Sequence, residues 1–332
     1  MKVGLYLTNQ QHLNVDMVSA LDEQIAMVRA ARDRGWDSIL AGQHFLNEGN
    51  NQQLEIVPYL ARLAAEAGEM TVGMGVFLLP LHNPVYVAET VATLDVITRG
   101  KFVFGIGLGY RDVEFDAFGV AKKDRVRRFE EGLALIKRLW SGEAVTHDSG
   151  LGKLDNVTMN IRPVQRPHPP IWIGGSGDKP VRRAARLGDT WFISPMETVG
   201  DLRGQVAVYR DELDKQGKPF PRDFPLFREI FVAQDRRTAL EVAGPWLRSK
   251  YADYARWGAG EGAGQVNLED LAKDRFILGS PEECYEQLRP FWEDLGINHF
   301  VFRTHWVGMP ASDSLASIRL ISNELLPELR KL

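Results

Sequence analysis

Apolar runs alternate with amphipathic stretches along the whole chain. Residues 2–8 form an apolar run that predicts a strand, and the next stretch carries apolar residues at helical spacing: Met17, Leu21, Ile25 and Val28. The same alternation predicts further strands at residues 36–41, 71–79, 101–107, 171–174, 190–194, 226–233 and 298–303. The pattern therefore predicts eight strands, each followed by a helix.

These strands read as continuous apolar runs, which is typical of a parallel sheet with helices on its outside. Eight such units fit a closed (β/α)₈ TIM barrel, with a doubly wound sheet as the alternative. No linker interrupts residues 1–332, so we expect a single domain. Residues 141–170 are rich in glycine, proline and polar residues and predict an insertion, with a short strand near 158–162. Residues 258–275 begin with a glycine-rich stretch and predict a mobile loop.

Composition narrows the class of protein. The chain has 332 residues, a formal net charge of −4 and a hydrophobic content of 44%. The charge gives no general attraction to nucleic acid, and the apolar runs are shorter than the ~20 residues of a membrane span. The first apolar run is too short for a signal peptide, so we expect a cytoplasmic protein. One cysteine, Cys284, excludes an intramolecular disulfide and a cysteine metal cluster.

If the strands form a TIM barrel, we expect the active site at their carboxyl ends, because active sites of such barrels lie there. His44, His82 and His305 each follow a predicted strand. They lack the spacing of a metal motif, so we expect no metal site.

Glycine-rich turns are the second candidate. Gly105-Ile106-Gly107-Leu108-Gly109 is not the dinucleotide fingerprint G-x-G-x-x-G. Gly174-Gly175-Ser176-Gly177 precedes a predicted helix, where backbone N–H groups suit a phosphate, although a plain turn explains the pattern equally well. Gly73 and Gly75 inside a strand indicate either a flat ligand close to the backbone or tight packing.

Five stretches, residues 35–45, 73–84, 94–109, 162–178 and 303–310, resemble the bacterial luciferase-like flavin-dependent monooxygenases. The resemblance covers nearly the whole chain and implies a (β/α)₈ barrel that binds FMN at its carboxyl-terminal face. It implies a non-proline cis peptide at Gly75–Val76 beside the flavin ring. It also implies phosphate contacts at the turns after the fourth and fifth strands, here Gly109, Tyr110, Arg111, Gly174, Gly175, Ser176 and Gly177.

The resemblance makes His44 the catalytic candidate. Its imidazole would give or take a proton beside the flavin, although a hydrogen-bonded rim histidine is the alternative reading. This chain departs from luciferases proper, which have Glu-His-His at Gln43-His44-Phe45 and a phosphate-binding arginine at Leu108. We expect Phe45, His82, His305 and Trp306 to line the substrate pocket.

Three functions remain open from the sequence. The first is a two-component monooxygenase that takes reduced FMN from a separate NAD(P)H:flavin reductase and uses O₂ to oxygenate a small organic substrate. The second is an F420-dependent oxidoreductase that transfers hydride, and the third is a non-catalytic flavin-binding protein. A homodimer also stays open, as in relatives.

Overall fold

The strands form one parallel sheet at the centre of the molecule. The computed structural model describes residues 1–47, 49–256 and 272–332. Neighbouring strands follow the order β11-β10-β7-β5-β3-β1-β14-β12-β13, and every pair in this path is parallel. The strands are β1 (Lys2–Leu7), β3 (Ser38–Ala41), β5 (Thr71–Met74), β7 (Phe102–Gly107), β10 (Ile171–Gly174), β11 (Thr190–Phe192), β12 (Pro225–Val232), β13 (Ile277–Gly279) and β14 (His299–Arg303).

The sheet curls around a small interior cluster. A parallel bridge between Ile193 and Leu226 joins the segment after β11 to β12. The cluster takes one buried side chain from each of seven strands: Tyr6, Leu40, Val103, Trp172, Phe192, Phe227 and Val301. A flat doubly wound sheet would not gather side chains from strands so far apart in its path, so the curled arrangement is the better description.

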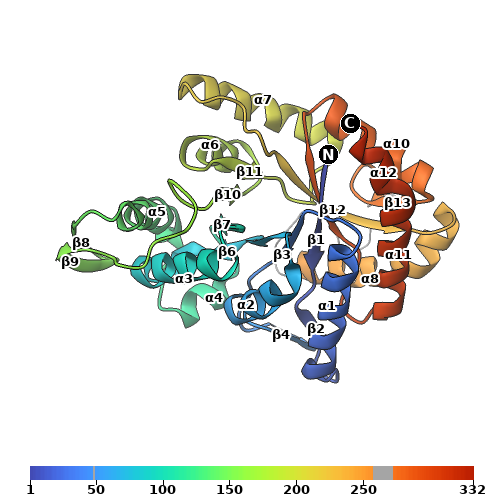
Figure 1. Cartoon of the computed structure of the whole chain (residues 1–332), viewed down its shortest axis with the longest axis horizontal. Coiled ribbons are helices and arrows are strands. Elements are labelled where there is room, and N and C mark those ends of the chain that lie inside the picture. Colours follow the sequence, from blue (N-terminus) through green and yellow to red (C-terminus); the bar gives the residue numbers. More distant parts are fainter. Residues whose placement is uncertain (48, 257–271) are drawn as a thin grey trace.

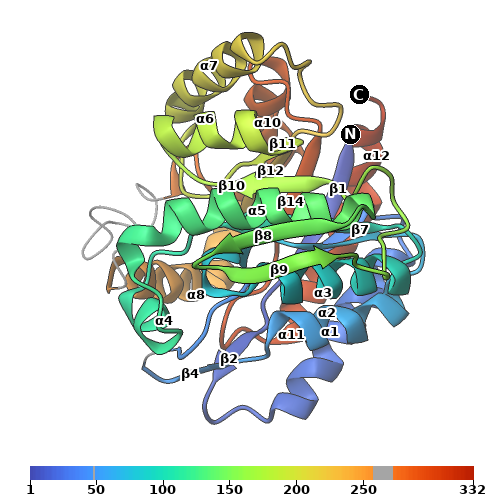
Figure 2. The same ribbon diagram turned by 90° about the vertical axis from the view of Figure 1, so that its left-hand side faces the viewer.

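Helices cover the outside of the strands (Figures 1 and 2). They are α1 (Met17–Arg32), α2 (Ile56–Ala67), α3 (Pro84–Ile97), α4 (Asp112–Ala117), α5 (Arg125–Ser141), α6 (Asp178–Leu187), α7 (Val199–Lys215), α8 (Arg236–Arg256), α10 (Pro281–Glu293), α11 (Ala311–Leu320) and α12 (Leu326–Arg330). Short turns at η1 (Leu79–Leu81), η2 (Lys122–Asp124) and η3 (Ile321–Leu325) complete the helical elements among the described residues. The buried residues of most helices join the strands in one large apolar core, whereas those of α8 and α4 belong to two smaller clusters.

Local sequence sets where several helices begin. The Asn83 side chain accepts hydrogen bonds from the backbone N–H groups of Val85 and Tyr86, with Pro84 at the first helical position. Ser280 and Glu283 form a capping box at the start of α10. These caps fix where α3 and α10 begin.

Three elements differ from the sequence prediction. The strand expected at 71–79 is broken after β5, and β6 (Phe77–Leu78) pairs with β7 on its own. The insertion holds an antiparallel hairpin of β8 (Val145–Ser149) and β9 (Gly152–Val157), whereas the strand expected near 158–162 is absent. The pattern also missed β13, which has only three residues. Most of the loop expected to be mobile falls on residues 257–271, which lie outside the described residues.

Candidate functional site

Most of the predicted site residues follow β3, β5, β7 and β10, which are successive neighbours in the sheet and all run in the same direction. Their carboxyl ends therefore lie side by side. A short antiparallel pair, β2 (Gln10–His12) with β4 (Asn51–Gln53), follows β1 and β3 at the same edge.

The peptide bond between Gly75 and Val76 is cis, as the resemblance implies. The Tyr6 hydroxyl donates a hydrogen bond of 2.7 Å to the Gly75 carbonyl oxygen. A Cβ at Gly42 would lie 2.3 Å from the same hydroxyl, so only glycine leaves room for this contact. Strands β1 and β3 thus support the segment that breaks the strand at 71–79.

Glycines of β7 and β10 make room for that segment. A Cβ at Gly105 would lie 1.8 Å from the Met74 carbonyl oxygen, and one at Gly107 would lie 2.7 Å from Val76 Cγ2. A Cβ at Gly174 would lie 3.0 Å from Val76 Cγ1. The glycine pattern at 105–109 is therefore explained by close packing around Val76, and not by a dinucleotide fingerprint.

The turn after β10 has the chemistry of an anion site. Gly177 has a φ of +81° and precedes α6, whose first turn has no side-chain cap. The Gly177 N–H donates to Gln205 Oε1 at 3.2 Å, and Ser176 is exposed beside it. Trp191 Nε1 donates to the Gly175 carbonyl at 2.8 Å and ties the turn to β11. Uncapped N–H groups at a helix start suit a phosphate.

His44 pairs with a buried carboxylate. Its Nδ1 lies 2.9 Å from Glu114 Oε1, and the Phe45 backbone N–H donates to the same oxygen at 2.9 Å. Glu114 is fully buried on α4, and its Oε2 has no hydrogen-bond partner among the described residues. Since a carboxylate only accepts, His44 carries its proton on Nδ1.

Arg111 holds the loop that carries His44. Its guanidinium donates to the Phe45 carbonyl at 2.9 Å and to the Leu46 carbonyl at 3.0 Å, and it lies 3.4 Å from Glu114 Oε1. The residue is only 4% exposed. This placement makes Arg111 a support for the loop after β3, which differs from the phosphate contact expected from the sequence. Tyr110, its neighbour, lies edge-on to the His44 ring at 5.7 Å between centroids.

His82 lies in an aromatic group on the same rim. Its ring stacks on Phe77 at 4.3 Å between centroids, and Phe45 lies 5.8 Å away. Burial lowers the pKa of His82 to about 4, so the imidazole is neutral at neutral pH. The structure thus brings together His82 and Phe45, two of the residues expected to line the substrate pocket.

His305 and Trp306, which were expected to line the substrate pocket, are both almost completely buried. His305 is 2% exposed, its Nε2 lies 2.9 Å from the Met309 carbonyl, and burial lowers its pKa to about 4. Trp306 Nε1 donates to Glu229 Oε2 at 2.7 Å. Although burial raises the pKa of Glu229, the charges of Lys250 and Arg303 outweigh it and lower that pKa below its usual value.

Sequence reasoning missed the polar partners of the predicted residues: Tyr6, Gln43, Glu114 and Glu229. Glu114 carried a signal, because it is an acidic residue in a short helix that directly follows the fourth strand. Glu229 is a charged residue inside a buried apolar run, and such a residue points to a buried partner. Nothing in the sequence indicates which residue that partner is.

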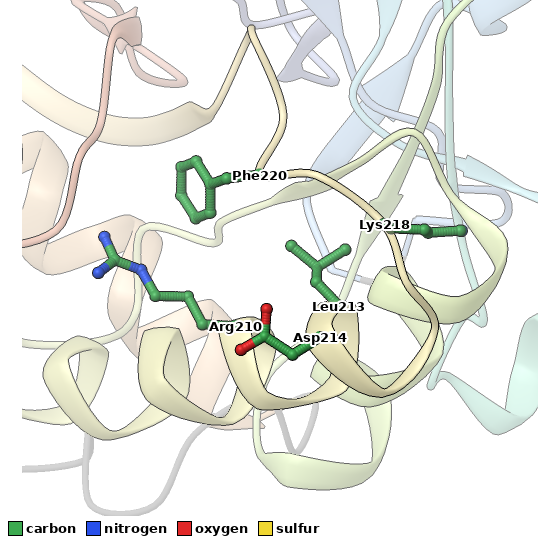
Figure 3. Close-up of a pocket in the computed structure, with 5 residues that line it drawn as sticks. All are labelled: Arg210, Leu213, Asp214, Lys218 and Phe220. Carbon is green, nitrogen blue, oxygen red and sulfur yellow. The ribbon is translucent and has the colours of Figure 1, made fainter.

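Two other features of the described residues bear on function. Figure 3 shows a surface pocket of about 350 Å³, lined by Arg210, Leu213, Asp214, Lys218 and Phe220. It lies between the end of α7 and the loop that leads into β12, so it is at the amino ends of the strands, away from the site. In the described part of the chain, no group of three metal-ligating side chains occurs, and none of its helices has the length and apolarity to span a membrane.

The curled parallel sheet and the polar groups at its carboxyl edge define a TIM-barrel-type α/β protein. The chain belongs to the luciferase-like monooxygenase family, because the model of that family matches residues 1–299.

Curated relatives of this chain are oxidoreductases. It is 26% identical over 318 residues to an F420-dependent glucose-6-phosphate dehydrogenase of Nakamurella multipartita, covering 91% of each protein. It is 24% identical over 332 residues to the oxygenase component of the flavin-dependent trigonelline monooxygenase of Acinetobacter baylyi, covering 92% of this chain and 89% of that protein.

Solved structures share the fold. The monooxygenase RslO1 from Streptomyces bottropensis matches with a TM-score of 0.87 at 22% identity over 99% of both chains. These two curated relatives are named for dependence on a flavin and on F420, and the family resemblance expected from the sequence is confirmed.

Proposed function

We propose that this protein is an FMN-dependent monooxygenase that binds reduced flavin at the carboxyl ends of its strands and oxygenates a small organic substrate with O₂. The observation that carries the proposal is that the His44–Glu114 pair and the uncapped glycine turn before α6 both follow carboxyl ends of strands in the same parallel sheet. Uncapped backbone N–H groups suit the phosphate of a flavin, and an imidazole paired with a carboxylate suits proton exchange with a bound ligand.

The residues present fit a phosphate-tailed cofactor. The Gly174–Gly177 turn and the uncapped start of α6 offer N–H donors to the phosphate, with the Ser176 hydroxyl beside them. Gly109 and Tyr110 follow β7, the strand adjacent to β10, and complete this side of the cradle. When bound, FMN supplies the electrons that activate O₂.

His44 and Glu114 supply the proton chemistry. Glu114 accepts from His44 Nδ1 and stabilises a positive imidazole after Nε2 takes a proton. Arg111 and the Phe45 N–H hold the carboxylate in place, so the ring keeps its orientation during turnover. The side chains around Phe45 and His82 exclude water from the reacting groups.

An F420-dependent hydride transfer is the second candidate. It is favoured by the His44–Glu114 pair, because oxidation of an alcohol needs a base for the hydroxyl proton. It is also favoured by the curated relatives that use F420. A flavin-binding protein without turnover is the remaining alternative.

Activity assays separate these functions. The first assay contains NADH, a flavin reductase, FMN, O₂ and candidate substrates, and oxygenated product is expected. The second contains F420 and candidate alcohols without O₂, and bleaching of F420 would favour hydride transfer. Release of H₂O₂ alone in the first assay, with no reaction in the second, would contradict both catalytic proposals.

Three further features stay proposals. We propose that the strands close as a full (β/α)₈ barrel, supported by the Ile193–Leu226 bridge. The monooxygenase proposal requires a separate NAD(P)H:flavin reductase, as the oxygenase component named among the relatives suggests. A homodimer remains open and is tested by the mass of the protein in solution.

A further inference from the structure

Four rings form an aromatic cluster beside His44: Phe45, Phe77, His82 and Phe118. Phe118 lies 4.7 Å from Phe45 and 5.6 Å from His82 between ring centroids, and it is 39% exposed. The cluster rests on buried apolar residues of η1 and α4, and it reaches the surface through Phe118. His82 is its polar member.

Gln43 faces the imidazole of His82 and has a fixed orientation. It is 3% exposed, and its Nε2 donates to Glu55 Oε1 at 3.1 Å. Its Oε1 accepts from the Leu78 backbone N–H at 2.9 Å. A carboxylate only accepts and a backbone N–H only donates, so the nitrogen and oxygen of this amide cannot exchange places.

This orientation sets the tautomer of His82. Gln43 Oε1 lies 3.3 Å from His82 Nε2, so Nε2 carries the proton and donates it. Nδ1 is then a lone-pair acceptor. Among the described residues, no hydrogen bond reaches Nδ1. The ring therefore presents one neutral acceptor inside aromatic surroundings.

We propose that His82 Nδ1 accepts a hydrogen bond from a hydroxyl group on an otherwise apolar substrate, and that Gln43 is the positioning residue that keeps it an acceptor. The inference rests on the proposed function, because it places the substrate at the same rim. A hydroxyl satisfies the lone pair, whereas a carboxylate or phosphate would face it with another acceptor and lose hydration among aromatic rings.

The test uses the full chain saturated with FMN or F420, whichever it binds, and two probes of similar shape. Cyclohexanol offers a donor, and methoxycyclohexane does not. We expect cyclohexanol to bind about five- to tenfold more tightly, as one hydrogen bond allows. We also expect it to shift the ¹⁵N resonance of His82 Nδ1 while Nε2 stays protonated. Equal affinities, no binding of either probe, or an unmoved Nδ1 resonance would overturn the proposal.

Two kinds of variant separate recognition from positioning. His82→Phe keeps a ring and removes the acceptor. Cyclohexanol and methoxycyclohexane should then bind with about equal affinity, while the affinity for the cofactor stays unchanged. Gln43→Leu should give a mixture of both His82 tautomers in the ¹⁵N spectrum.

His147→Phe, at a histidine that hydrogen-bonds Ser149 in the β8–β9 hairpin, is the matched control and should leave the preference intact. A His82→Phe variant that keeps the preference, or a Gln43→Leu variant that keeps one tautomer, would contradict the assignment. Failure of the wild type to bind either cofactor would instead contradict the proposed function. Cofactor binding without a hydroxyl preference would remove this inference alone.

Discussion

Glycines, which have no Cβ atom, allow β5, β7 and β10 to pack closely against one another. Gly107 and Gly174 flank the Val76 side chain, and Gly105 lies against the Met74 carbonyl. For Gly73 and Gly75, inside the preceding strand, the sequence left a flat ligand and tight packing open as reasons, and Leu40 lies 3.2 Å from a Cβ at either position. The structure shows tight packing at these positions, because the neighbours are already within contact distance of any Cβ.

Gly107→Ala should destabilise the protein by about 1–3 kcal/mol, because the new Cβ would overlap Val76 Cγ2. The measurement is urea unfolding at neutral pH. Gly204→Ala in α7 is the matched control, since nothing lies near its Cβ position. That helical change should stabilise by about 0.5–1 kcal/mol. Equal stability of the Gly107→Ala variant and the wild type would show that the packing around Val76 is looser than described.

His44→Ala should lower kcat by about 100-fold or more, because it removes the group that moves the proton. Glu114→Gln should lower kcat less, and the double variant should be no slower than His44→Ala, because the two residues act as one unit. His168→Ala, before β10 at the amino ends of the strands, serves as the control. Additive losses in the double variant would mean that Glu114 acts on its own.

Two hydrogen bonds join β3, β14 and the loop before β12 at the amino ends of the strands. Ser38 Oγ, at the start of β3, lies 2.9 Å from His299 Nε2, at the start of β14. His299 Nδ1 lies 2.9 Å from Asp223 Oδ1, in the loop before β12. Ser38 is fully buried, so this Ser-His-Asp arrangement has no access to a substrate and serves the packing of the strands.

The hydrogen bonds of Asp223 predict that the folded protein loses stability at low pH. Burial raises the pKa of Asp223, but the hydrogen bond and charge of His299 and the contact with Lys2 outweigh it and hold that pKa at about 2. Asp223 therefore stabilises the fold fully above its ordinary pKa of 3.8, and the contribution is lost as pH falls toward about 2.

Asp223→Asn should lower the urea concentration at the unfolding midpoint at neutral pH. Between about pH 4 and pH 2, the midpoint of this variant should decrease less steeply than that of the wild type. Unfolding curves at a series of pH values measure both effects. Asp148→Asn in the exposed hairpin should change neither. A wild-type slope that survives in Asp223→Asn would assign the acid sensitivity to other carboxylates.

Long elements were predictable and short ones were not. The stripes of α1 and α3 have several turns of helical spacing, so their type and position followed from the sequence. The three residues of β13 and the six of α4 are too few to show a period, and both depend on contacts from elsewhere in the chain. Because α4 carries Glu114, the partner of His44 was missed for the same reason.

The beginning of β1 and the end of α12 lie side by side and are joined by hydrogen bonds. The Met1 ammonium donates to the Leu329 carbonyl at 3.2 Å. Arg330 donates to the carbonyls of Met1 and Gly35 and pairs with Asp37 at 2.8 Å. The first strand and the last helix therefore depend on each other, and a single domain stays a prediction.

Unfolding should be one cooperative transition for the whole chain. Far-ultraviolet circular dichroism and tryptophan fluorescence should give coincident urea curves. Arg330→Ala should lower the midpoint of that transition without splitting it. Two separated transitions would contradict the single domain.

The central claim is that the carboxyl ends of β5, β7 and β10 bind a flavin or deazaflavin through its ring and phosphate. Fluorescence titration with FMN and with F420 tests it most directly, using the wild type and Gly177→Val, which strains the left-handed turn before α6. We predict saturable quenching by at least one cofactor, weakened about tenfold or more in Gly177→Val, where each tenfold step is about 1.4 kcal/mol. No quenching by either cofactor, or equal affinity in the folded variant, would contradict the claim.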